Sequence, residues 1–225
     1  MTTFELVPRI GLEFVCRHIA GARDPFERPH AWYALVELSS TQTGADLAAG
    51  FENTLATAIE RGVAGDAVTA TSDSQRKSLW RLRETIPEAQ RHEGVSLKHD
   101  ISVEPARIPH FIDQGRALLA RLAPGARLVA YGHLGDGNLH FNLSAPAGDD
   151  GQVLQKSVDA IRRGVHDLVA AHGGSFSAEH GIGQLKVGEL ARYEDPAALD
   201  LMRRVKQAID PQGIMNPGKV LADRE

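Results

Sequence analysis

The segment YGHLGDGNLHFNL, residues 131–143, constrains the fold more than any other, because an Asp-Gly pair separates two runs of alternating polar and apolar residues. Asp136-Gly137 predicts a two-residue hairpin turn, since both central positions of the favoured turn need positive φ. In that register His133 lies directly opposite His140, and opposed residues of antiparallel strands project from the same face. The sequence therefore predicts a β-hairpin with two neighbouring imidazoles.

The two faces of this hairpin differ in polarity. The apolar face is expected to join the core and carries Ala130, Leu134, Leu139, Phe141 and Leu143. The polar face carries Tyr131, His133, His140 and Asn142. A solvated sheet face and a metal site both explain this second face, because a pair of histidines is not diagnostic by itself. A third ligand is needed to separate the two interpretations.

Strand and helix patterns interleave along the rest of the chain. Strands are expected at 31–39 and 95–103, and helices at about 47–62, 72–90 with a kink at Pro87, 107–122 and 154–173. Because at least one connection is a tight hairpin, an antiparallel sheet with helices on one face fits better than a doubly wound parallel sheet. We therefore expect an α+β fold resembling a ferredoxin-like cap.

The character of the sequence changes after Gly173. The stretch SFSAEHGIGQLK is polar and rich in glycine, and DPQGIMNPGKVL ends the chain after short helical patterns. We expect an α+β substrate or cap domain over 1–175, followed by a loop and short helical tail over 176–225 that complete the site.

Composition narrows the classes of function. A net charge of −4 and the absence of a block of like charges argue against nucleic acid as a partner. The single Cys16 cannot form an internal disulfide, which fits a reducing compartment. The N-terminus lacks a signal-peptide pattern and no segment is apolar enough to span a bilayer, so a cytoplasmic protein without a transmembrane segment is expected.

The loop SAEHGIG offers the missing third ligand. It contains Glu179 and His180, and a carboxylate added to the two histidines gives a set that binds catalytic metals and leaves positions open for substrate. The alternative is that Glu179 caps the next helix. Arg83 in LWRLRE and Lys98 in KHDISV are the best candidates for binding an anionic substrate, although each alone is more often a surface charge.

Five motifs, in this order, carry a resemblance to a known family: LWRLRE, KHDISV, YGHLGDGNLHFNL, SAEHGIGQLK and DPQGIMNPGKVL. They resemble the C-terminal half of the FAD-linked oxidases of the vanillyl-alcohol oxidase superfamily. The most similar branch is the 2-hydroxy-acid dehydrogenases, which act on D-lactate, glycolate or D-2-hydroxyglutarate. The resemblance implies a domain that binds substrate and metal while a 2-hydroxy acid is oxidised to a 2-oxo acid by hydride transfer to FAD.

The resemblance also assigns roles to individual residues. It implies that a divalent metal, expected to be zinc, is held by His133, His140 and Glu179. It implies that the substrate carboxylate is bound by Arg83 and Lys98, that Asn142 lines the pocket and that His180 accepts the hydroxyl proton. The residues implied to reach the flavin are Asn216 and Lys219. Pro87 stands where some members carry a hydroxyl residue, so the identity of the 2-hydroxy acid stays open.

The FAD-binding half of such an enzyme is not expected within these residues, because their glycines do not form the strand, glycine-loop and helix unit that cradles a dinucleotide. The expected partners are an FAD-binding domain or subunit and an electron-acceptor protein, and the chain alone is expected to be inactive. Two alternatives stay open: a free-standing metal-dependent hydrolase that uses His133, His140 and Glu179, and a non-catalytic module that binds a metal or a carboxylate.

Overall fold

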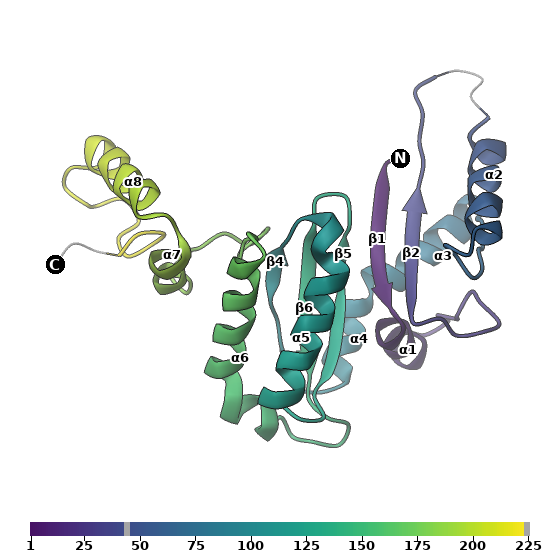
Figure 1. Ribbon diagram of the computed structural model, residues 1–225, viewed down its shortest axis with the longest axis horizontal. Helices are drawn as coiled ribbons and strands as arrows, with labels where there is room; N and C mark the ends of the chain where they lie inside the picture. Colours follow the sequence, from purple (N-terminus) through teal and green to yellow (C-terminus); the bar gives the residue numbers. More distant parts are fainter. Residues whose placement is uncertain (43–45, 223–225) are drawn as a thin grey trace. The chain divides into compact units, whose positions relative to one another are not determined.

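A computed structural model describes residues 1–42 and 46–222 of the chain (Figure 1). The chain forms two compact units, Met1–Phe176 and Ser177–Glu225. The first unit holds an antiparallel sheet with its covering helices, and the second holds two helices and connecting loops. The expected α+β class with short helices at the C-terminal end is therefore confirmed.

The sheet of the first unit has the strand order β2-β1-β5-β6-β3, and β4 also pairs with β6. Its strands are β1 Thr3–Pro8, β2 Trp32–Glu37, β3 Ser96–Leu97, β4 Asp100–Ser102, β5 Arg127–His133 and β6 Asn138–Ser144. Every pairing is antiparallel. The first strand of the chain therefore lies in the middle of the sheet, beside the hairpin of β5 and β6.

The helices of the first unit are α1 Arg9–His18, α2 Leu47–Glu60, α3 Asp73–Glu84, α4 Ile86–His92, α5 Ile108–Leu122 and α6 Gln152–Ala171, with a short 3₁₀ helix η1 at Pro105–Arg107. In Figure 1, α5 lies in front of the hairpin of β5 and β6 with α6 beside it, and α4 lies behind these strands.

The apolar face of the hairpin packs on α5 and α6. Leu139, Phe141 and Leu143 are fully buried against residues such as Phe111 of α5. Gly115 of α5 allows this close approach, because a Cβ at its position would lie 2.5 Å from Cζ of Phe141. The apolar half of the predicted alternation is thus confirmed.

The other face of the sheet is also covered, which differs from the expected arrangement with helices on one face. Val129 and Tyr131 of β5 pack with Phe14 of α1 and with Ile86 and Ala89 of α4 in a second core. The polar positions of this face therefore lie partly beneath helices. The interpretation of that face as solvated fails for Tyr131 and Asn142, which are buried, whereas His133 and His140 stay partly exposed.

Two predicted elements are each divided in the structure. The helix expected over 72–90 stops at Glu84 and restarts at Ile86, because Pro87 has no N–H to donate and its ring clashes with the carbonyl of residue 83. The strand expected over 95–103 is interrupted at Lys98 and His99, although β3 and β4 keep one common register with β6. The break after α3 leaves Arg83 in the last turn of that helix.

The second unit holds α7 Val187–Tyr193 and α8 Pro196–Ile209. Helix α8 begins at Pro196 because the Asp195 carboxylate accepts a hydrogen bond from the backbone N–H of Ala197 at 2.7 Å, and proline tolerates the first helical position. The tail then returns to the glycine-rich loop, where Val220 N donates to the carbonyl oxygen of Gly183 at 2.8 Å. No helix in the described part of the chain is long and apolar enough to cross a membrane.

Candidate functional site

The hairpin keeps both histidines on its polar face but in a different register from the predicted one. Tyr131, and not His133, lies opposite His140. Continuing this ladder would place Asn138 opposite His133, so the two histidines are diagonal neighbours rather than an opposed pair. The prediction of a shared face holds, whereas the prediction of direct opposition is wrong.

The loop that causes this shift has four residues, 134–137, instead of two. Gly137 has a φ of 78°, but Asp136 is not among the residues with positive φ, so the predicted turn type is also wrong. The Asp136 carboxylate accepts from Asn138 N at 3.0 Å, and the Gly137 carbonyl accepts from Val103 N at 3.1 Å. Contacts with the segment after β4 therefore set the loop, and these are not visible in the hairpin sequence.

A buried carboxylate, Glu5 of β1, joins two of the predicted site residues. Its side chain is 1% exposed, and its Oε2 accepts from Nε of Arg83 at 2.7 Å. Its Oε1 lies 2.5 Å from Nδ1 of His133, the residue directly opposite on β5. The structure thus brings Arg83 and His133 together through a third residue.

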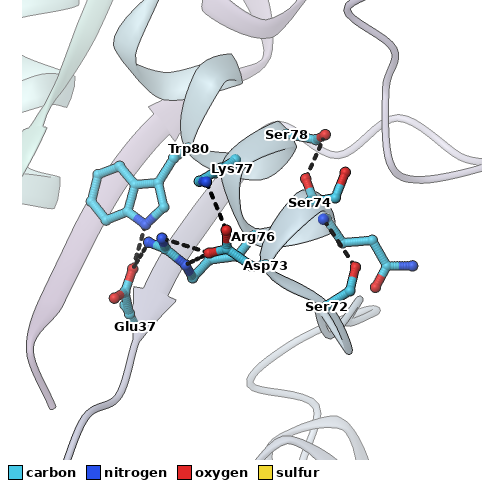
Figure 2. A network of polar contacts seen from close by, with 9 residues as sticks. Glu37, Ser72, Asp73, Ser74, Arg76, Lys77, Ser78 and Trp80 are labelled. Atoms are coloured by element: carbon cyan, nitrogen blue, oxygen red, sulfur yellow. Dashed lines mark hydrogen bonds and ion pairs between the residues drawn. The ribbon is translucent and has the colours of Figure 1, made fainter.

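Helix α3 is fixed over the sheet by residues on the same helical face as Arg83. Trp80 Nε1 donates to the Glu37 carboxylate of β2 at 2.5 Å, and Arg76 donates to the same carboxylate at 3.5 Å (Figure 2). Ser72 caps the helix by accepting from Gln75 N at 3.2 Å. Positions 76, 80 and 83 recur at helical spacing, so anchoring the first two also orients the third.

The ring of Tyr131 contacts both Arg83 and His140. The Arg83 guanidinium carbon is 4.8 Å from the centroid of this ring, and the His140 ring centroid is 4.8 Å from it on tilted planes. Burial raises the pKa of the Tyr131 hydroxyl, although the Arg83 charge and a hydrogen bond with Asn142 partly offset that effect. Tyr131 therefore stays neutral at physiological pH and serves as an aromatic platform for the cation.

Asn142, which the resemblance places in the pocket lining, is buried in the structure. It is 3% exposed, and its Nδ2 donates to Oε1 of Gln90 on α4 at 3.1 Å. Its Oδ1 accepts from His99 N at 3.2 Å, and Gln90 in turn donates to Ser144 at 3.1 Å. This buried chain of amides joins α4 to β6 and stabilises the sheet beneath the histidines.

A second polar pair lies on the other side of His140. Asp100 of β4 is paired directly with His140, and its Oδ1 accepts from Nδ2 of Asn138 at 3.0 Å. Both side chains are at least nine-tenths buried, and Oδ1 of Asn138 has no hydrogen-bond partner among the described residues. The polar face thus contains one buried acceptor that a ligand or a water molecule could satisfy.

Lys98 does not pair with a buried carboxylate as Arg83 does with Glu5. It is exposed at the break between β3 and β4, and it makes no ion pair with any residue in the described ranges. The neighbouring residue His99, also between β3 and β4, is buried instead, and its Nδ1 lies 3.0 Å from the Phe141 carbonyl oxygen.

Glu179, His180, Asn216 and Lys219 belong to the second unit and are all exposed. The loop that carries the first two is closed by Ser177 Oγ, which donates to the Gly181 carbonyl at 2.7 Å and accepts from Nζ of Lys186 at 2.9 Å. The N-cap of α7 is Lys186, so Glu179 does not cap the next helix. That alternative explanation of Glu179 is therefore wrong.

The described residues contain no group of three or more His, Cys, Asp and Glu side chains that could hold a metal ion. His133 and His140 share one face of the first unit, while Glu179 is in the second unit. The donor types suit a divalent transition metal, but the first unit by itself supplies two of the three predicted ligands.

Glu5 and Tyr131 were not singled out as site residues by the sequence patterns. A usable signal for Glu5 is its position in TFELVP, where one carboxylate interrupts an otherwise apolar β pattern and needs a cation when buried. Its partners, however, lie 78 and 128 residues further along the chain. The pairing of β1 with β5 brings His133 to Glu5, and the packing of α3 brings Arg83.

Comparison with known proteins places the whole segment in one group. A family model described as FAD linked oxidases, C-terminal domain, matches residues 1–220. The mitochondrial D-2-hydroxyglutarate dehydrogenase of Arabidopsis thaliana is 35% identical over 221 residues, which are 98% of this chain and 38% of that protein. The D-2-hydroxyglutarate dehydrogenase of Stutzerimonas stutzeri (strain A1501) is 36% identical over 200 residues, 88% of this chain and 42% of that protein.

The mitochondrial D-2-hydroxyglutarate dehydrogenase of Rattus norvegicus is 36% identical over 225 residues, which are 100% of this chain and 40% of that protein. The chain therefore spans less than half of the length of these relatives. Among solved structures, p-cresol methylhydroxylase with substrate bound superposes with a TM-score of 0.60 at 14% identity, over 98% of this chain and 47% of that one. This likeness concerns the fold alone and agrees with the α+β class.

Proposed function

The chain belongs to the family of FAD-linked oxidase C-terminal domains, and from this premise we propose that it is the substrate-binding part of an FAD-dependent dehydrogenase. The proposed reaction oxidises D-2-hydroxyglutarate, or a similar 2-hydroxy acid, to the 2-oxo acid. The names and the identity of the relatives support this substrate class. The proposed partner is a flavin-binding domain or subunit, from which an acceptor protein would take the electrons.

The fixed position of Arg83 is the observation that carries this proposal. The residue is 8% exposed, its Nε donates to Glu5, and its guanidinium carbon lies over the Tyr131 ring. Its two terminal nitrogens make no hydrogen bond with any residue that the structure describes. A guanidinium with this edge available matches a carboxylate in bidentate geometry, so we assign the substrate carboxylate to Arg83, with exposed Lys98 as the second cation.

His180 is proposed to accept the proton of the substrate hydroxyl. A neutral imidazole suits this role near neutral pH, and the glycine-rich loop closed by Ser177 presents His180 to solvent. FAD, when bound, supplies the acceptor for the hydride from the substrate Cα. Asn216 and Lys219, both exposed in the C-terminal tail, are the residues of this chain proposed to reach the flavin, while Asn142 supports the pocket from below.

His133, His140 and Glu179 are the residues proposed to hold a divalent metal such as zinc. Support comes from the shared face of the two histidines and from the carboxylate on Nδ1 of His133, an arrangement typical of metal-binding histidines. A metal at this position would supply Lewis acidity toward the hydroxyl and carboxylate oxygens of the substrate.

Replacing Arg83 tests the proposal in the enzyme that joins this chain to its flavin-binding half. Arg83→Ala should lower kcat/KM for D-2-hydroxyglutarate more than about tenfold, because a charge-assisted contact contributes roughly 1.5–3 kcal/mol. Arg91→Ala is the matched control, since Arg91 is exposed on α4, and it should leave kcat/KM unchanged. Equal kcat/KM for both variants would show that Arg83 does not bind the substrate.

A further inference from the structure

We infer that Glu5 is a positioning residue that sets both the orientation of Arg83 and the tautomer of His133. The inference rests on the proposed function for the roles of these two residues and adds a third residue behind them. Its geometric basis, however, lies entirely within the first unit.

The position of Glu5 leaves little freedom to either carboxylate oxygen. Strand β1 pairs with β5 so that Glu5 is opposite His133, and the Glu5 side chain is 1% exposed. One oxygen is 2.7 Å from Nε of Arg83, and the other is 2.5 Å from Nδ1 of His133. Because a buried carboxylate needs compensation for its lost hydration, these two contacts are tightly linked to the fold.

The chemistry of the three groups fixes where the protons lie. Arg83 stays protonated, so its Nε–H always donates, and an ionised carboxylate can only accept. The hydrogen between Glu5 and His133 must then be on Nδ1, which places the lone pair of the neutral ring on Nε2. Metal-binding histidines use the same arrangement, in which a carboxylate on one nitrogen makes the other a better ligand.

The same contact sets how Arg83 meets a substrate. Glu5 accepts the hydrogen bond from Nε of Arg83, and the guanidinium carbon lies 4.8 Å from the centroid of the Tyr131 ring, so these two contacts restrict the direction of the terminal nitrogens. One carboxylate therefore orients the proposed carboxylate-binding cation and the proposed metal ligand together.

The substitution Glu5→Gln tests whether Glu5 sets the tautomer of His133 or only supports the fold. The glutamine amide has nearly the same shape as the carboxylate, but it presents one oxygen and one NH₂ in place of two oxygens. Arg83 cannot become an acceptor, so the amide oxygen must face Arg83 and the NH₂ must face His133. Nδ1 of His133 must then accept, and its hydrogen moves to Nε2. Glu5→Gln should therefore reverse the tautomer of His133 without a large change in the fold.

The experiment is ¹⁵N NMR of the chain labelled at histidine, recorded at a pH where the imidazoles are neutral, with His133 assigned by the loss of its signals in His133→Gln. The parent should show a protonated Nδ1 at His133, and Glu5→Gln should show a protonated Nε2. Glu84→Gln is the matched control, since Glu84 is exposed on α3, and it should keep the parent tautomer. A protonated Nε2 in the parent, or the same tautomer in parent and Glu5→Gln, would overturn the inference.

A variant that fails to fold does not leave the role of Glu5 untested. If Glu5→Gln does not fold, the parent spectrum alone decides, since a protonated Nε2 there is incompatible with the inference. With zinc as the probe, Glu5→Gln should bind at least about tenfold more weakly than Glu84→Gln, the usual effect of losing such a supporting carboxylate. Absence of zinc binding in the parent would count against the proposed metal, whereas the tautomer result would still test the role of Glu5.

Discussion

Glu93 shows how strongly a single buried carboxylate can respond to its surroundings in this protein. Its side chain is 7% exposed and contacts Arg17, Arg127 and His18, the last at 2.7 Å. Burial alone raises the pKa of Glu93, but the hydrogen bonds from Arg127, His18 and Arg17 outweigh burial and lower the pKa to about 2. The ionised form is therefore the one that stabilises the fold.

The sign of the resulting pH dependence follows from this lowered pKa. Because the pKa of Glu93 is about 2 in the folded chain and 4.5 without these contacts, its stabilising effect is complete above pH 4.5 and disappears as the pH falls toward 2. Glu93→Gln should destabilise the protein by about 3 kcal/mol at neutral pH and much less near pH 2. Urea unfolding of the parent and of Glu93→Gln between pH 2 and pH 7 measures this difference in the free energy of unfolding. A difference that does not change with pH would contradict the lowered pKa of Glu93.

At the scale of residues, the sequence patterns identified which side chains carry chemistry but not which of them are joined. The alternation of the hairpin predicted that His133 and His140 share one polar face, as the pairing of β5 with β6 shows. The contact that links Arg83 of α3 to His133 through Glu5 was not predicted. Glu5 escaped notice since β1 was not predicted as a strand and its partners are distant in sequence.

At the scale of elements, the hairpin loop decides where the histidines lie. Gly137 has a φ of 78°, and a Cβ at its position would be 1.9 Å from the Val103 carbonyl oxygen. Gly137→Ala should therefore destabilise the protein by more than about 2 kcal/mol and shift the hairpin resonances, since both strain and a backbone clash oppose it. Gly135→Ala is the matched control, because nothing lies within 4 Å of its added Cβ.

Thermal or urea unfolding of these two variants measures the difference directly. Gly135→Ala should stay within about 0.5 kcal/mol of the parent. If both substitutions are equally mild, the contact between Gly137 and Val103 does not set the loop. The Asp-Gly pair correctly predicted a hairpin, whereas the four-residue loop depends on Val103, which lies more than thirty positions earlier in the chain.

At the scale of the molecule, both buried clusters of the sheet lie within Met1–Phe176. This unit should therefore fold without the second one, because all the described residues of the two buried clusters belong to the first unit. Residues 1–176 expressed alone should give a cooperative melting curve and native-like near-ultraviolet circular dichroism. A broad transition with strong binding of a hydrophobic dye would contradict this expectation.

The sequence predicted the α+β class of the molecule because its periodicities are strong and local. The helices on the second face of the sheet were not predicted, since the polar residues beneath them suggest solvent when read alone. The buried amide and carboxylate contacts that make this face part of the interior arise from pairing between distant segments.

A single-turnover measurement on the enzyme that unites this chain with its flavin-binding half tests the proposed reaction most directly. The enzyme, loaded with FAD, is mixed without oxygen with D-2-hydroxyglutarate, and flavin absorbance is followed while the organic product is quantified. We predict that the flavin is reduced and that one 2-oxo acid forms per flavin, with reduction much slower in Arg83→Ala. A flavin that stays oxidised after mixing with D-2-hydroxyglutarate, D-lactate and glycolate alike would contradict the proposed reaction.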